Sequence, residues 1–215
     1  DKGNTSLYYA ASQDWPAYRS DVTKLVKLLL ERGANANFQS NDGGLSPLHY
    51  SVKACNIEMT DALIQAGAEV KVKDNQDNTL LHYVAQGKYI GDSGWLVQAQ
   101  VYPKPVDDKV YEAEINAENE GCQLIKKLVE RGVSPNHKNK KGLAPLHEAA
   151  DRGYVAMVQE LLNYCDINQL DDSKDTILHI AAFQGDWKTI EESVFGIPDL
   201  NIFNSYGWTP LHCAV

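Results

Sequence analysis

Apolar side chains recur at helical spacing in three segments of the chain. These segments are LVKLLLERG at 25–33, LIKKLVERG at 124–132 and MVQELLNY at 157–164. Within each segment the apolar residues stand three and four positions apart, so they share one face of a helix. Glycine follows at Gly33 and Gly132, where such a helix should end. The pattern predicts amphipathic helices that each bury one face.

A second motif, centred on a Leu-His pair, recurs through the chain. It reads SPLHYSV at 46–52, TLLHYVA at 79–85, APLHEAA at 144–150, TILHIAA at 176–182 and TPLHCAV at 209–215. A weaker copy, TSLYYAA at 5–11, has Tyr8 in the place of the histidine. Successive histidines are 33, 65, 32 and 33 residues apart. A proline in the first helical turn loses no hydrogen bond and presets φ, so Pro47, Pro145 and Pro210 are predicted helix starts.

The two motifs alternate and define one unit of about 33 residues. Each Leu-His motif precedes a segment such as LLLERGANANFQ at 28–39, which leads into a turn rich in Asn, Asp, Gly and Lys. Each unit is therefore predicted to contain a helix, a short loop, a second helix and a turn. A single unit cannot bury the apolar faces of both its helices, so neighbouring units must stack.

This two-part unit strongly resembles the ankyrin repeat, whose signature includes T-P-L-H-x-A. The resemblance covers nearly the whole chain outside two insertions. It implies an all-α fold, an ankyrin-repeat solenoid of stacked helix-turn-helix units joined by hairpin-like turns. The predicted repeats of this single domain are 1–41, 42–74, 75–139 with an insertion near 88–119, 140–171, 172–204 and a partial unit at 205–215. Neither end carries the polar cap typical of terminal repeats, so we expect a fragment of a longer chain.

The two insertions lengthen the first unit at 12–21 and the third unit near 88–119. The stretch 107–130 lacks proline and keeps apolar or small residues at near-helical spacing, which favours an early-starting, lengthened second helix. Alternatively, the 65 residues between His82 and His147 contain a degenerate repeat. Because both insertions join the two helices of a unit, we expect them on the same side of the stack. Insertions of this kind often lie on the binding face.

The repeated histidines are His49, His82, His147, His179 and His212. A catalytic histidine is needed once, whereas a residue at the same phase of every unit serves the unit. The family resemblance implies that it bridges backbone and side-chain groups between neighbouring repeats. His137, in the turn NHKNKKG, lies outside this series and is predicted to be solvated.

Asparagine recurs at one position of the turn that follows the second helix. The residues are Asn37, Asn136, Asn168 and Asn201, with Lys71 as the exception. We expect these side chains to bond turn backbone, as asparagine often does. The alternative, implied by the family resemblance, is that they undergo Asn hydroxylation in an animal cell.

The charge and cysteine pattern narrow the partner class. The formal net charge is −9, so the large basic surface that nucleic acid requires is not expected. No apolar run approaches the roughly 18–20 residues that cross a bilayer, so membrane insertion is not predicted. The cysteines Cys55, Cys122, Cys165 and Cys213 form no C-x-x-C pair, which argues against a disulfide framework or a zinc site. Reduced thiols indicate a cytoplasmic location, and no metal or cofactor is predicted.

Two features carry weak catalytic signals. GDSGW at 91–95 is similar to the nucleophile loop of trypsin-like proteases, but Ser93 would need a base and an acid converging from a β-barrel frame. A run of carboxylates spreads around a predicted helix, which favours a solvated face over a metal or acid-base site. Its members are Asp107, Asp108, Glu112, Glu114, Glu118 and Glu120. We expect no enzymatic activity from this segment.

The family resemblance implies that partner contacts come from turn tips and from outer positions of each first helix. The matching candidates are Asn75, Gln76, Asn78, Gln86, Lys140, Lys141, Leu143, Asp151, Arg152, Asp172, Ser173, Phe183, Gln184, Tyr206 and Trp208. Large exposed aromatics are favoured interface anchors, which singles out Phe183 and Trp208. Alternatively, these two rings pack against an adjacent turn or a missing repeat. The insertion aromatics, which either anchor the insertions or contact a partner, are Trp15, Tyr18, Trp95 and Tyr102.

Together these features predict a non-catalytic module, an adaptor or scaffold that binds a protein partner through its concave face and turn tips. The alternative is a targeting domain of a larger enzyme or of a pathogen effector, which would act in the host cytoplasm. A monomer is favoured. Specificity resides in variable positions of a common fold, so the partner's identity does not follow from the fold.

Overall fold

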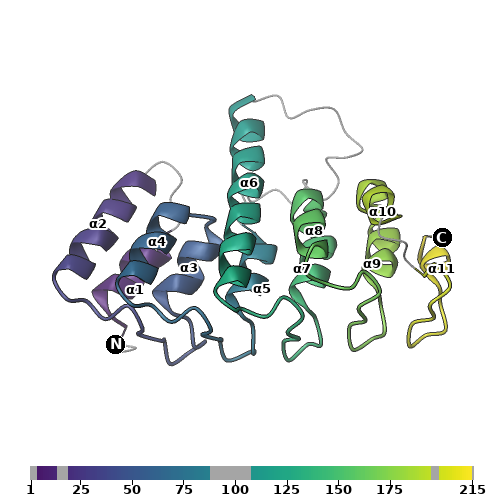
Figure 1. The fold of residues 1–215 in the computed structure, drawn as a ribbon, viewed down its shortest axis with the longest axis horizontal. Helices are drawn as coiled ribbons and strands as arrows, with labels where there is room; N and C mark the ends of the chain where they lie inside the picture. Colours follow the sequence, from purple (N-terminus) through teal and green to yellow (C-terminus); the bar gives the residue numbers. More distant parts are fainter. Residues whose placement is uncertain (1–3, 14–18, 88–107, 195–198, 215) are drawn as a thin grey trace.

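The computed structural model describes residues 4–13, 19–87, 108–194 and 199–214. The described helices form a stack of pairs (Figure 1). They are α1 (Ser6–Ser12), α2 (Arg19–Glu31), α3 (Pro47–Lys53), α4 (Ile57–Gln65), α5 (Leu80–Gln86), α6 (Asp108–Glu130), α7 (Pro145–Asp151), α8 (Val155–Leu162), α9 (Ile177–Gln184), α10 (Trp187–Val194) and α11 (Pro210–Cys213). In this part of the chain the only β pairing is an isolated bridge between Lys73 and Thr79. The predicted all-α solenoid is confirmed.

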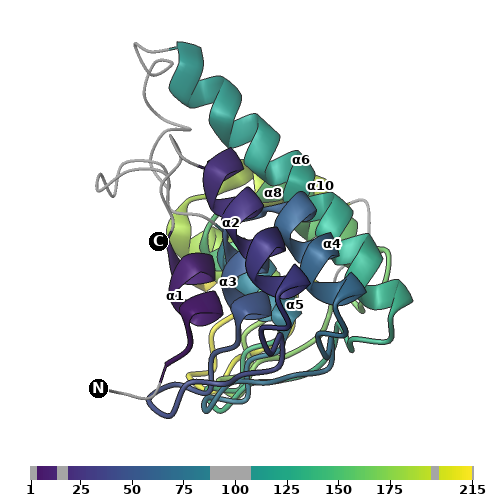
Figure 2. The same cartoon turned by 90° about the vertical axis from the view of Figure 1, so that its left-hand side faces the viewer.

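The stack has two layers of helices. The first helices, α1, α3, α5, α7, α9 and α11, contact one another in sequence order. In the second layer α2 contacts α4, and α8 contacts both α6 and α10. The turns that join successive pairs extend from one edge of the stack, below the helices in Figures 1 and 2. The fold therefore presents a row of turn tips beside a row of short helices.

The repeated histidine closes the start of a first helix, and at His82, His147 and His179 it also reaches the next unit. In α5 the backbone N–H of Thr79 donates to His82 Nδ1 at 3.1 Å. Nδ1 is thereby the acceptor nitrogen, so the ring proton lies on Nε2 and donates to the carbonyl oxygen of Leu143 at 2.9 Å. Burial of His82 lowers its pKa to about 4, which keeps the ring neutral.

The same arrangement recurs in the neighbouring first helices. His147 Nε2 donates to Gln169 O and His179 Nε2 donates to Trp208 O, both at 3.0 Å. In α11 the backbone N–H of Thr209 donates to His212 Nδ1 at 3.2 Å. His49 bonds the Ser46 N–H at 3.0 Å, but its buried Nε2 has no hydrogen-bond partner within the described part of the chain. His82, His147 and His179 thus link their helix starts to the next unit.

Between the two layers lies one continuous hydrophobic core. Leu48, Leu81, Leu124, Leu146 and Ile177 are each 1 % exposed or less and belong to a single buried cluster. Burying one such side chain contributes about 1.5–3 kcal/mol relative to exposure. Because the first five units all contribute to this core, the turns at its edge are held on a rigid support.

The second helix of the third unit is much longer than its counterparts. Helix α6 has 23 residues, whereas α4 has 9 and α8 has 8. It rises beyond the neighbouring helices in Figure 1. The early-starting, lengthened helix predicted for the stretch 107–130 is therefore confirmed for Asp108–Glu130.

A glycine lets this long helix pass close to its neighbours. A β-carbon on Gly121 would collide with Met157 Cε and would lie 3.2 Å from Met157 Sδ. A larger residue at this position would therefore require the flexible Met157 side chain to move.

Several predictions lie outside the described residues. They concern the remainder of the insertion at 88–107, the relative placement of the two insertions, and the residues Ser93, Trp15, Tyr18, Trp95 and Tyr102.

Candidate protein-binding surface

Each turn is folded around one short polar side chain. Asn139 Oδ1 accepts the N–H groups of Lys141 at 2.9 Å and Leu143 at 3.1 Å. Asn204 Oδ1 accepts those of Tyr206 and Trp208, both at 3.0 Å. Asp and Asn favour such turns because their side chains mimic a backbone carbonyl. The tips are therefore fixed before any partner arrives.

Neighbouring tips are also bonded to one another. The N–H of Asn75 donates to Gly43 O at 2.9 Å, and that of Lys140 donates to Gln76 O at 2.9 Å. Further along, the N–H of Ser205 donates to Ser173 O at 2.8 Å. These three bonds, together with the ion pair of Lys138 and Asp172 at 3.4 Å, join successive turns into a ridge along the edge of the stack.

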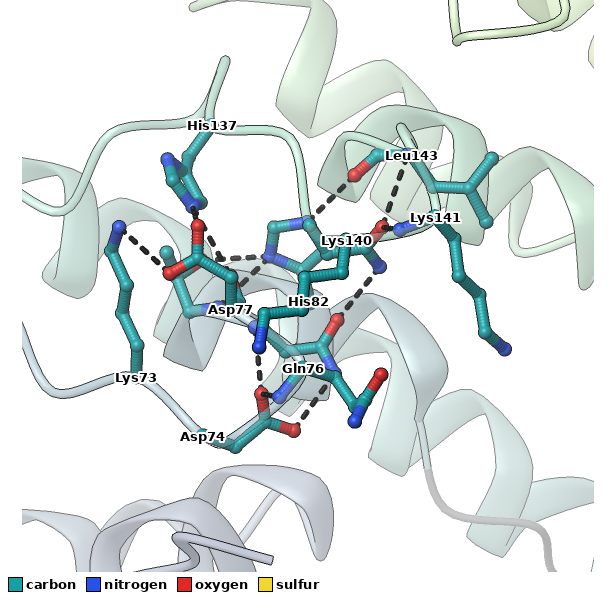
Figure 3. Close-up of polar contacts among 12 residues, drawn as sticks. Lys73, Asp74, Gln76, Asp77, His82, His137, Lys140, Lys141 and Leu143 are labelled. Carbon is teal, nitrogen blue, oxygen red and sulfur yellow. Dashed lines mark hydrogen bonds and ion pairs between the residues drawn. The ribbon is translucent and has the colours of Figure 1, made fainter.

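Figure 3 shows the part of this ridge between the third and fourth units. The Asp77 carboxylate forms an ion pair with Lys73 Nζ at 3.1 Å and a hydrogen bond with His137 Nε2 at 3.0 Å. The hydrogen bond from Lys73, together with its charge and that of His137, lowers the pKa of the Asp77 carboxyl. The prediction that His137 is merely solvated is wrong, because its side chain is only 24 % exposed and it ties two turns together.

Asp74 is a second carboxylate that holds side chains of this region in place by hydrogen bonds. The sequence pattern did not identify it. Its Oδ2 accepts the Tyr83 hydroxyl at 2.7 Å and the Asn78 amide at 2.8 Å. Burial opposes ionisation of Asp74, but these hydrogen bonds outweigh it and lower its pKa. Asn78 also accepts the Asn139 amide at 2.7 Å.

Most of the predicted partner-binding side chains lie on the surface, but one does not. The exposed ones are Asn75, Gln76, Lys140, Lys141, Asp151, Asp172, Ser173, Phe183, Gln184, Tyr206 and Trp208, and those of intermediate exposure are Gln86, Leu143 and Arg152. Asn78 is only 8 % exposed and its amide is used within the stack. We therefore remove Asn78 from the candidate surface.

The turn asparagines show the backbone bonding expected of them at two positions. Asn37 donates its amide to Gly67 O at 2.9 Å and accepts the Glu69 N–H at 2.7 Å. Asn168 accepts the Asp199 N–H at 2.9 Å. In both cases the bonded backbone belongs to the next unit, so these side chains stabilise stacking.

The most exposed aromatic side chains of the candidate surface gather near the carboxyl end of the stack. Phe183, at the end of α9, and Tyr206, in the following turn, are each 74 % exposed, and Trp208 is 49 % exposed. Together with Asp151 and Asp175, these rings line a groove of about 280 Å³. This groove combines apolar walls with acidic groups.

Two features are absent from the described residues. No helix among them has the length and apolar character needed to cross a membrane. Likewise, no group of three or more His, Cys, Asp or Glu side chains in the described ranges is placed to hold a metal ion.

The stacked helix pairs and linked turns of this chain place it among the helical repeat proteins. A family model described as ankyrin repeats, in three copies, matches residues 7–101 and again 114–194. The chain therefore belongs to the ankyrin repeat family. Ankyrin repeats act generally as protein–protein interaction modules, and the family is generally without catalytic activity.

Similar proteins come from diverse organisms. The chain is 28 % identical over 215 residues to a putative ankyrin repeat protein of Acanthamoeba polyphaga mimivirus. The aligned region covers 98 % of this chain and 26 % of the viral protein. It is 26 % identical to the human transient receptor potential cation channel subfamily A member 1, over 90 % of this chain and 18 % of the channel. An NAD-dependent deacetylase, sir2B, of Dictyostelium discoideum is 24 % identical over 82 % of this chain and 28 % of the deacetylase. The chain thus spans about a quarter or less of the first two relatives.

Proposed function

We propose that this chain is a non-catalytic binding module that holds a protein partner on its concave face and turn tips. The observation that carries the proposal is the 74 % exposure of Phe183 at the end of α9, in a groove that it lines together with Tyr206 and Trp208 of the following turn. Aromatic side chains of this kind are frequent hot spots of protein interfaces. We further propose that the chain is monomeric and acts in the cytoplasm.

Rigidity supports this function. Tyr206 and Trp208 belong to a turn that is closed by the buried side chain of Asn204, and Trp208 O accepts a hydrogen bond from His179. A surface that is ordered before binding loses little conformational entropy on association. Contacts made by these rings therefore translate more fully into affinity.

The test begins with affinity capture of partners by the intact chain, followed by a dissociation constant for the partner recovered. The double variant Phe183→Ala and Trp208→Ala should weaken binding by at least about 30-fold, as expected for two hot-spot residues. Tyr164→Ala is the matched control, because Tyr164 is an exposed aromatic just beyond α8, in the outer layer. Equal affinity of the double variant and the wild type would refute the proposed surface.

A second candidate function is that of a targeting domain in a larger enzyme or effector. The similarity to a segment of an NAD-dependent deacetylase, and to viral ankyrin proteins, favours it. In that case the same surface would bind the substrate or anchor of the larger protein. Reading the coding sequence on both sides of this segment tests this, because a catalytic domain would be encoded there.

A further inference from the structure

We infer that the groove beside Phe183 and Trp208 binds an arginine side chain from a basic segment of the protein partner. The inference rests on the proposed function and names the chemistry that the partner presents. It follows from three properties of the groove: its aromatic walls, its two unneutralised carboxylates and its fixed shape.

The aromatic walls suit a flat cation. The rings of Tyr206 and Trp208 lie 6.0 Å apart, tilted by 43°, and Phe183 lines the same groove from α9. A guanidinium group stacks on aromatic faces and gains attraction from their electron-rich centres. The groove has a volume of about 280 Å³, which is enough for one long side chain.

Two carboxylates lie at this groove without a cationic partner. Asp151 accepts the amide of Gln184 at 3.0 Å, and Asp175 accepts the amide of Asn204 at 2.8 Å. These amides are neutral, so they orient the carboxylates and leave their charges intact. Neither Asp151 nor Asp175 belongs to an ion pair with any residue that the structure describes.

Two other carboxylates of the ridge form ion pairs with lysine side chains. Asp77 bonds Lys73 at 3.1 Å, and Asp172 faces Lys138 at 3.4 Å. The cation nearest in sequence to Asp151 is Arg152, whose guanidinium lies 3.6 Å from the buried Glu148 carboxylate. The groove thus contributes two carboxylates in a chain whose net charge is −9.

Arginine fits these features better than an apolar side chain does. An apolar occupant would cover the carboxylates and remove water from them without supplying a charge. A guanidinium can stack on an aromatic ring and also donate to a carboxylate of the groove through its planar set of N–H groups. The acidic chain would also attract a basic segment over longer distances.

The test uses the whole 215-residue chain, labelled with ¹⁵N. The probe is N-acetyl-arginine N-methylamide, and its uncharged control is the corresponding citrulline derivative, which has nearly the same shape. The indole N–H signal of Trp208 is assigned by comparison with Trp208→Phe. We expect a saturable shift of this signal and of the Gln184 amide with the arginine probe, and at least about fivefold weaker binding of citrulline.

Two matched variants locate the charge. Asp151→Asn should weaken binding of the arginine probe by about fivefold or more, because it removes one carboxylate of the groove. Asp172→Asn removes an exposed carboxylate of the ridge that does not line the groove, and should leave binding unchanged. Equal binding of citrulline, or no loss in Asp151→Asn, would overturn the inference. N-acetyl-lysine N-methylamide is titrated as a third probe, and binding equal to that of the arginine probe would overturn the choice of arginine.

Failure of this inference is distinguishable from failure of the proposed function. If the double variant of Phe183 and Trp208 loses the captured partner while the arginine probe gives no saturable shift, the surface stands and the arginine site is wrong. If partner binding is insensitive to Phe183 and Trp208, both proposals are wrong.

Discussion

The aromatic side chains at the two ends of the stack have opposite surroundings. Near the amino end, the Tyr8 ring packs edge-on against Phe38 at 5.7 Å and Tyr50 at 5.3 Å, and the Tyr8 and Tyr50 hydroxyls are hydrogen-bonded at 2.8 Å. Near the carboxyl end, Phe183 and Tyr206 are 74 % exposed. Aromatic residues whose rings and hydroxyls are satisfied inside the stack stabilise it, whereas those left open are available to a partner.

Burial also lowers the pKa of histidines along the stack, including His147 in the carboxyl half. In the amino half, burial lowers the pKa of His49 and of His82 to about 4. The unfolded state, with a pKa near 6.5, then binds more protons than the folded state between these values. Stability is therefore full above about pH 6.5 and falls as the pH is lowered toward 4.

Protonation of these two histidines gives the largest expected change in the free energy of unfolding. At pH 5 each of the two histidines should reduce the free energy of unfolding by about 2 kcal/mol relative to pH 7.5, or about 4 kcal/mol together. Urea unfolding measured at several values between pH 7.5 and pH 5 checks this. A free energy that stays constant over this interval would show that the imidazoles are not desolvated in solution.

The next effect comes from removing a ring of the amino-end cluster. Tyr8→Ala deletes a side chain that is only 9 % exposed, and should lower the free energy of unfolding by about 3 kcal/mol through lost packing. Its neighbour Tyr9 is 50 % exposed and packs edge-on against Tyr8 at 5.8 Å, so Tyr9→Ala should lose less, about 1 kcal/mol. Equal losses in the two variants would remove the distinction between packed and open rings.

A smaller change tests a single hydrogen bond. Tyr83→Phe removes the hydroxyl that donates to Asp74 at 2.7 Å, and should lower the free energy of unfolding by about 1–2 kcal/mol. The pKa of Asp74 should rise in the same variant, because one of the bonds that lowers it is lost. Tyr206→Phe is the counterpart at the exposed end and should change stability by less than about 0.5 kcal/mol. NMR titration of the Asp74 carboxyl and urea unfolding provide the two readouts.

The repeat pattern was sufficient to predict the architecture, because the periodic spacing of apolar residues and the phase of the Leu-His pair are local properties. It also predicted the extended helix α6 from the stretch between Asp107 and Glu130. Individual polar residues of the turns were harder. Asn78 and Asn75 look equivalent in sequence, yet Asn78 is bonded to Asn139, which lies 61 residues further along.

The roles of His137 and Asp74 were missed for a related reason. His137 bonds Asp77, 60 residues away in the chain, and this contact depends on the register between two turns. A single sequence contains no measure of that register. The groove beside Phe183 likewise arises from α9 and from a turn of the following unit, so its acidic and aromatic groups converge only once the units are stacked.

Phe183→Ala has the smallest expected effect on stability, and it tests the comparison between the two ends of the stack most directly. Phe183 is largely exposed and lies near the end of α9, where alanine is the better helix former by about 0.5 kcal/mol. Phe183→Ala should therefore leave the free energy of unfolding unchanged or raise it slightly, while partner affinity falls. A loss of more than about 1.5 kcal/mol would mean that the ring packs as Tyr8 does. Phe183 would then belong to the framework of the stack, and the difference between its two ends would lie in Tyr206 and Trp208 alone.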